Sequence, residues 1–380
     1  MIKMRKKICF VVSSPLTATA FLVNHIKALS DFYDVYLVAN FDSVNPDIFK
    51  NVPLKGIKDI NILRNINLFS DTKTLFALRK YFKEEQFDAV HTVTPKAGLL
   101  GILGARLAGT KKRIHIFTGQ VWHTKKGIFK RLLMFIDKFI VWNATDILVD
   151  GESQRLFLIE NNIVENDKSF VLGKGSISGV DTNRFVPNSD VRNAFRNEIG
   201  YQPDDVVFTF LGRMNIDKGM LELAVAFDKL SQKYDKVRLL LIGFDEENIE
   251  ALMKKKVKNS EKVFFYGMTP SPEKIMQAGD VFCLPSYREG FGTSVIEASL
   301  LEKPIICSDT YGLMETIIDN ETGLRHKVAD AESLFSQMEV LVNNENMRHQ
   351  LGKKGREYVL ENFSAQQISD KWLEFYRNKI

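Results

Sequence analysis

The chain has 380 residues, of which 45% are hydrophobic and 26% are charged, and its formal net charge is +5. This composition is typical of a soluble globular protein with room for two domains. The mild charge comes without the aromatic and basic repeats of single-strand nucleic-acid binders, so we expect no nucleic acid partner. Cys9, Cys283 and Cys307 lie far apart in the sequence and show no zinc-ligand spacing, which predicts reduced core thiols.

The first half of the chain alternates strand and helix signals. Short β-prone runs at 8–12, 35–39 and 88–91 predict strands, and 21–29 and 75–82 between them have helical spacing. This order is typical of βαβ units in a doubly wound parallel sheet, which binds ligands at the carboxyl ends of its strands. Because the run at 8–12 is too short for a signal peptide or a spanning helix, we expect a cytoplasmic protein.

Polar residues that follow the predicted strands are candidate ligand contacts. Thr17 lies in the loop after the first strand, and Thr118 and Gln120 follow a strand that begins at Arg113. Lys96 stands at the start of a helix, where its charge opposes the helix dipole, and this favours a functional role. We expect these residues to face a cleft at the carboxyl ends of the strands.

Segment 125–142 has the spacing of an amphipathic helix with basic residues. Two interpretations stay open: a core helix with a solvated charged face, which is the commoner arrangement, and a helix that lies on an anionic membrane surface. The apolar side chains expected on one side are Ile128, Phe129, Leu132, Leu133, Ile136, Phe139 and Ile140. The charged side chains expected on the other side are Lys126, Lys130, Arg131, Asp137 and Lys138.

A second alternating series begins with a strand at 206–211, which leads into the segment GRMNIDKG at 212–219 and then a helix. Arginine offers a planar fork of donors to phosphate oxygens, and lysine offers a mobile point charge. Arg213 and Lys218 therefore predict an anion site at the end of this strand. Either cation alone would also be explained as a surface residue.

A further strand at 280–286 leads through a glycine loop into a helix, within the segment REGFGTSVIE at 288–297. Strand, glycine loop and helix N-terminus direct free N–H groups at one point, which suits a pyrophosphate. Glu289 and Glu297 have seven residues between them and can face the same pocket. Carboxylates repel phosphate, so we expect them to accept hydrogen bonds from hydroxyl groups of a sugar and a ribose. The alternative is that the helix dipole alone favours these acids.

The two acids resemble the E-x7-E signature of retaining glycosyltransferases of the GT-B type, and GRMNIDKG resembles the G-R-x4-K-G of the same family. The resemblance implies an α/β fold with two Rossmann-like domains whose parallel sheets face each other across a cleft. It implies that Arg213 and Lys218 bind the donor diphosphate and stabilise the leaving group. Glu289 would contact the donor sugar and Glu297 the ribose. The two cations would replace a metal, so we expect no metal and no other cofactor.

The resemblance also implies further donor contacts in the second half of the chain. The residues expected to contact the donor, besides those above, are Gly212, Gly267, Met268, Gly290, Phe291, Gly292 and Thr293. We expect Gly267 and Met268 beside the base, and the N–H groups of Gly292 and Thr293 as donors to the diphosphate.

The first half of the chain matches the family less closely. The segment HTVTPKAG at 91–98 resembles the family's H-x4-K-A-G, which lines the acceptor side and includes Lys96. Thr118 stands where relatives frequently have a histidine, and Ser178 stands where they usually have an asparagine. A mechanism that depends on this histidine therefore does not transfer. FTGQVW at 117–122 is similar to enzymes that extend lipid-linked bacterial glycans.

The resemblance predicts retaining, metal-independent transfer of a hexose or N-acetylhexosamine from a nucleotide-diphosphate donor, and the expected donor is a UDP-sugar. The acceptor would be a glycan or a polyprenyl-diphosphate-linked sugar in bacterial surface polysaccharide synthesis, at the inner face of the cytoplasmic membrane. The alternatives are a non-hydrolysing UDP-sugar epimerase and a non-catalytic scaffold that binds sugar nucleotides. The expected organisation is an acceptor-binding domain at 1–187, a nucleotide-sugar-binding domain at 188–361 and a closing helix within 362–380 that crosses back onto the first domain.

Overall fold

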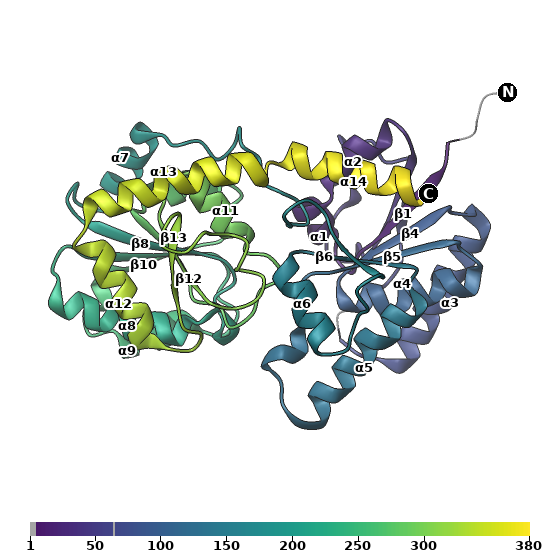
Figure 1. Ribbon diagram of the computed structural model, residues 1–380, viewed down its shortest axis with the longest axis horizontal. Coiled ribbons are helices and arrows are strands. Elements are labelled where there is room, and N and C mark those ends of the chain that lie inside the picture. The colour runs from purple at the N-terminus through teal and green to yellow at the C-terminus, as the bar shows by residue number, and fades with distance from the viewer. Residues whose placement is uncertain (1–4, 64) are drawn as a thin grey trace. The chain divides into compact units, whose positions relative to one another are not determined.

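The computed structural model describes residues 5–63 and 65–380 and divides the chain into two compact units. Unit 1 contains Met1–Gly179 and Ala365–Ile380, and unit 2 contains Val180–Ser364 (Figure 1). The domain boundaries predicted from the sequence lie after residues 187 and 361. Each unit is a parallel β-sheet with helices around it, which confirms the predicted α/β class.

Unit 1 is built on a seven-stranded sheet in the order β3-β2-β1-β4-β5-β6-β7, with all neighbours parallel. The strand order reverses between β1 and β4, so the loops after these strands leave the sheet in opposite directions. The strands are β1 (Lys7–Val11), β2 (Asp34–Ala39), β3 (Gly56–Asp59), β4 (Ala89–Val93), β5 (Lys112–Phe117), β6 (Asp146–Val149) and β7 (Ser169–Val171).

Helices cover both faces of this sheet. Ile8 and Phe10 of β1 pack with one set of helices, and Cys9 and Val11 pack with the other set, as the two-residue period of a strand requires. The first face carries α1 (Pro15–Phe21), α2 (Val23–Ser30) and the C-terminal α14 (Ala365–Lys379). The other face carries α3 (Leu68–Glu85), α4 (Pro95–Ala108), α5 (Gly127–Asn143) and α6 (Glu152–Glu160).

The helix α14 is fixed to unit 1 by a buried aromatic stack. The ring of Trp372 stacks with the imidazoles of His25 and His91, with centroid distances of 4.3 and 4.9 Å. Nδ1 of His91 is 2.7 Å from the hydroxyl of Tyr376. Burial lowers the pKa of His25 to about 4 and that of His91 well below its usual value, so both rings are neutral at pH 7. His91 is therefore a core residue.

The helix α5 differs from the expected core helix. Asp137, expected on its charged face, is buried and accepts a hydrogen bond of 2.7 Å from Nε1 of Trp122. Ile128 and Leu132, expected on the buried face, are 87% and 47% exposed. The helix is apolar around most of its circumference, so its spacing alone did not determine which side faces the core. Within residues 5–63 and 65–380, no helix has both the length and the apolar character needed to cross a membrane.

Unit 2 is built on a six-stranded parallel sheet in the order β10-β9-β8-β11-β12-β13. Its strands are β8 (Val206–Leu211), β9 (Val237–Ile242), β10 (Val263–Gly267), β11 (Val281–Leu284), β12 (Ile305–Ser308) and β13 (Gly323–His326). Its helices are α7 (Ser189–Glu198), α8 (Met220–Lys233), α9 (Ile249–Lys256), α10 (Pro272–Ile275), α11 (Thr293–Leu300), α12 (Ala331–Val342) and α13 (Glu345–Asn362).

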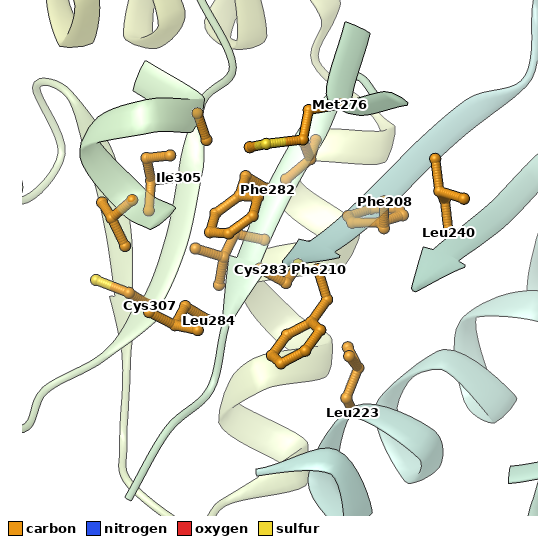
Figure 2. Packing of buried hydrophobic residues seen from close by; sticks show 14 of the residues in the cluster. Phe208, Phe210, Leu223, Leu240, Met276, Phe282, Cys283, Leu284, Ile305 and Cys307 are labelled. Carbon is orange, nitrogen blue, oxygen red and sulfur yellow. The ribbon is translucent and has the colours of Figure 1, made fainter. Parts of the chain in front are cut away.

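Large apolar side chains fill the centre of unit 2. Phe208 and Phe210 of β8 and Phe282 of β11 are fully buried. Figure 2 shows how they pack together with Cys283 and Cys307. The strand order reverses between β8 and β11, so the loops after these two strands start side by side at the carboxyl edge of the sheet. Both predicted donor motifs lie in these loops.

Candidate active site

The loops after β8 and β11 are packed directly against each other. The N–H group of Tyr287 donates to the carbonyl oxygen of Asp217 at 2.8 Å, and the guanidinium of Arg288 pairs with the Asp217 carboxylate at 3.1 Å. Gly219 has a φ of +71°, and a Cβ atom there would lie 1.9 Å from the carbonyl oxygen of Pro285. Only glycine permits this approach. Two segments that are distant in sequence therefore form one surface.

Lys218 and Glu289 meet at the centre of this surface. Nζ of Lys218 lies 2.5 Å from Oε1 of Glu289, and the hydroxyl of Ser286 donates to the same oxygen at 2.7 Å. The two charged side chains are 20% and 12% exposed. The structure thus brings one predicted catalytic cation into contact with the acid predicted to bind the donor sugar.

Arg213 is held by an acid that the sequence analysis did not identify. Its Nη1 lies 2.8 and 2.9 Å from the carboxylate oxygens of Glu246, and Nδ2 of Asn215 donates to the same carboxylate at 2.7 Å. Glu246 follows β9, the strand next to β8. The Arg213 side chain is half exposed. The acidic run 245–247 directly after a predicted strand was the signal that could have identified this partner.

The backbone at the N-terminus of α11 corrects one prediction. The N–H of Gly292 donates to the carbonyl of Gly312 at 3.1 Å, and the N–H of Thr293 donates to the carbonyl of Phe291 at 2.7 Å. The prediction that these two groups are free donors for a diphosphate is wrong, because the loop closes on itself and on the chain after β12. At this helix start, the N–H of Ser294 has no backbone acceptor within the described residues.

The remaining predicted donor contacts lie near the same edge. Gly212 directly follows β8, and Gly267 ends β10, where its carbonyl accepts from the N–H of Gly243 at 2.8 Å. The side chain of Met268 is 74% exposed.

Phe291 and Gly290 lie inside the loop after β11. The ring of Phe291 is 7% exposed and packs edge-on against Phe363 at 5.3 Å between centroids, so it supports the loop from the core side. Gly290 is buried as well.

Glu297 lies half-buried on α11. Burial raises the pKa of its carboxyl to about 7, the positive charge of Arg184 opposes this shift, and the negative charge of Glu273 adds to it. Arg184 and Glu273 are themselves paired at 2.7 Å. The carboxyl therefore changes its charge near neutral pH.

The candidate residues of unit 1 lie at separate places. Lys96 has its ammonium group 2.7 Å from the carboxylate of Asp71 and 2.8 Å from the carbonyl of Asn65, and only 11% of its side chain is exposed. This ion pair offsets the cost of a lysine at a helix start, so it gives Lys96 a structural explanation. Thr17 lies half-buried in α1.

Thr118 and Gln120 both follow β5. Thr118 lines a cavity of about 90 Å³ together with His115, Trp122 and Asp137. Gln120 is buried, and its Oε1 accepts from Nε2 of Gln154 at 3.1 Å.

Two buried acids of unit 1 were not among the predicted site residues. Burial raises the pKa of Asp137 to about 7, and the hydrogen bond from Trp122 opposes this shift. Burial raises the pKa of Asp150, which follows β6, to about 8. An acid directly after an apolar strand was the available signal for Asp150.

Two parallel-sheet units and paired motif loops at the carboxyl edge of unit 2 define a glycosyltransferase of the GT-B class. The fold matches the structure of Anabaena Alr3699/HepE in complex with UDP and glucose with a TM-score of 0.82 and 16% identity, over 98% of this chain and 100% of that chain. Residues 191–358 match the family described as glycosyl transferases group 1, and residues 56–175 match the glycosyl transferase 4-like domain.

The chain belongs to the group 1 glycosyltransferases. It is 31% identical to the capsular polysaccharide biosynthesis glycosyltransferase CapM of Staphylococcus aureus, over 83% of each chain. It is 26% identical to the UDP-Gal:alpha-D-GlcNAc-diphosphoundecaprenol alpha-1,3-galactosyltransferase of Escherichia coli, over 84% of this chain and 82% of the relative. The predicted family, fold and enzyme class are confirmed.

Proposed function

We propose that this protein transfers a hexose or an N-acetylhexosamine from a UDP-sugar to a glycan or a polyprenyl-diphosphate-linked sugar in bacterial surface polysaccharide synthesis. The observation that carries the proposal is the contact between Lys218 and Glu289, because it joins a phosphate-binding motif to a hydroxyl-binding motif. The Escherichia coli relative, whose name gives a UDP-sugar donor and a lipid-diphosphate acceptor, supports the choice of substrates. The name of CapM supports the pathway.

Both cations of the site are held by acids. Lys218 pairs with Glu289 and Arg213 pairs with Glu246. A diphosphate brings two negative charges and competes for both cations, which then stabilise the charge that develops on the leaving group. The carboxylate of Glu289 is released to accept a hydrogen bond from a hydroxyl group of the donor sugar. The chain's own cations thus supply the charge that a metal would supply.

The transfer proceeds with retention at the anomeric carbon. The acceptor oxygen forms a bond to this carbon on the face from which the phosphate oxygen departs, and the leaving phosphate takes the proton of the acceptor hydroxyl. This route assigns no side chain as a general base, and it rests on the resemblance of Glu289 and Glu297 to the E-x7-E signature.

The proposed function is tested by the products formed from UDP-sugars with and without a polyprenyl-diphosphate-linked acceptor. We expect an α-linked product from an α-linked donor in NMR spectra, with release of UDP and no requirement for a divalent metal. A β-linked product would contradict retention. An epimerised UDP-sugar formed without any acceptor would instead identify an epimerase, and unchanged UDP-sugars under all conditions would identify a non-catalytic scaffold.

Replacement of Glu289 by glutamine is expected to lower kcat/KM for transfer by about 10- to 100-fold, the range for a lost hydrogen bond to a charged group. UDP affinity should not fall, because Glu289 contacts the sugar and the loss of its charge leaves Lys218 free for the diphosphate. Glu339→Gln is the matched control, since Glu339 pairs with Lys233 on the helices of the same unit at 2.7 Å. An equal loss of UDP affinity and of transfer would contradict the assigned role.

The affinity for a UDP-sugar is expected to rise with pH. If the ionised Glu297 accepts hydrogen bonds from the ribose, the donor binds better above the pKa of about 7 than below it. A one-unit fall of this pKa in the complex corresponds to about a tenfold gain in affinity. Calorimetry at pH 6 and pH 8 measures the gain, and Glu297→Gln should abolish the pH dependence. If Glu297→Gln kept the pH dependence of UDP-sugar affinity, a group other than Glu297 would be responsible for it.

A further inference from the structure

One side of α5 carries large apolar side chains that point away from the core of unit 1. Ile128, Leu132, Phe135 and Trp142 are 87%, 47%, 64% and 67% exposed. Their spacing of three, four or seven residues places them on one face of the helix, where they form a stripe about four turns long. Single exposed apolar residues are ordinary, but a continuous stripe indicates a binding surface. We call these four residues the α5 stripe.

The exposed charges that α5 itself carries have one sign. Asp137, the single carboxylate in the α5 sequence, is buried and accepts a hydrogen bond from Trp122. The guanidinium of Arg106 from α4, the neighbouring helix (Figure 1), lies 4.5 Å from the ring centre of Trp142. The exposed cations of α5 and of the segment just before it are Lys125, Lys126, Arg131 and Lys138. Cations of α5, of the segment before it and of α4 therefore flank the apolar α5 stripe.

We propose that the α5 stripe docks unit 1 on an anionic lipid bilayer. The apolar side chains enter the boundary between headgroups and acyl chains, and the cations contact lipid phosphates. Trp142 suits this place, because tryptophan is enriched where one part of a ring is apolar and another is hydrated. A second copy of the chain fits the surface less well, because a two-fold contact would bring the same cations face to face.

The docking inference rests on the proposed function, since a polyprenyl-linked acceptor is presented at a membrane. The helix begins shortly after the loop that holds Thr118, and its residues Leu133 and Ile136 line the cavity that contains Thr118. Docking of α5 therefore holds this carboxyl-edge loop of unit 1 close to the lipid headgroups. An acceptor whose diphosphate lies at headgroup level would reach the loop without leaving the bilayer.

Vesicle sedimentation tests the inference on the full chain. Wild type should bind vesicles that contain one third phosphatidylglycerol, and the double variant Leu132→Asp, Phe135→Asp should lose at least about tenfold in partitioning. The double variant Arg131→Gln, Lys138→Gln should partition into these vesicles about 25-fold more weakly than wild type, which is a factor of about five for each charge removed. Leu360→Asp is the apolar control, since Leu360 is an exposed residue on a helix of unit 2. Lys254→Gln, Lys255→Gln on α9 is the charge control.

Equal binding of wild type and the α5 variants would overturn the inference. So would the absence of binding to anionic vesicles, or a dimer in light scattering that dissociates in the Phe135→Asp variant. UDP affinity should be unchanged in all these variants. If the wild-type protein bound UDP but not the vesicles, the docking alone would be refuted. If it bound the vesicles but not UDP, the docking would be supported and the proposed function refuted.

Discussion

Replacement of Lys218 by alanine is expected to lower kcat for sugar transfer by about 10²- to 10³-fold, the range measured when one preorganised donor to a developing negative charge is removed. Nζ of Lys218 is already at the junction of the two motif loops, 2.5 Å from Glu289. It therefore needs only a local exchange of partners to reach the leaving diphosphate. Release of UDP from a UDP-sugar in the presence of acceptor measures the effect.

The matched control for Lys218 is Lys233→Ala. Lys233 also pairs with a glutamate in unit 2, Glu339, but it lies at the end of α8, away from the motif loops. This exposed ion pair contributes little to stability, so kcat should not change. Lys218→Arg keeps the charge and should recover part of the rate. Equal activity of Lys218→Ala and Lys233→Ala would contradict the assigned role, and loss of the far-UV dichroism spectrum would assign the defect to folding.

Replacement of Trp372 by alanine is expected to lower the free energy of unfolding by about 3–5 kcal/mol, as for other buried aromatic residues cut to alanine. Trp372 is fully buried, and its ring stacks with those of His25 and His91. The variant leaves a cavity between α14 and the sheet of unit 1 and removes the stacking with both imidazoles and the ring contacts with Phe10 and Tyr376. Denaturant unfolding followed by circular dichroism measures the loss.

Trp142 provides the control for this prediction, because the same residue type in the same unit is 67% exposed. Trp142→Ala should change the free energy of unfolding by less than about 0.5 kcal/mol. If the two variants lost the same stability, the stack would not be what fixes α14 to unit 1.

The sequence predicted the fold because strand and helix periods alternate along both halves of the chain. It also predicted that the two motif loops follow strands of the second sheet, because glycine, cation and acid spacings are local properties of a loop. Hydrogen-bond partners from distant segments could not be predicted in this way. Gly292 donates to Gly312, Arg213 pairs with Glu246 and Lys96 pairs with Asp71.

The buried side of α5 could not be predicted from the sequence for a different reason. A helix that is apolar around most of its circumference gives no contrast from which its buried side can be read. Asp137 looked like a surface charge, but the indole N–H of Trp122 pairs with it inside unit 1. Only the packing of α5 against α4 and β5 shows that the outward face is apolar.

Calorimetric titration of UDP into wild type, Arg213→Ala, Lys218→Ala and Lys233→Ala tests the central claim most directly. If the loops after β8 and β11 form one diphosphate site, Arg213→Ala and Lys218→Ala each weaken UDP binding by at least about tenfold, as expected for a lost charge-assisted hydrogen bond, and Lys233→Ala binds like wild type. Equal UDP affinity in all four proteins would contradict the account.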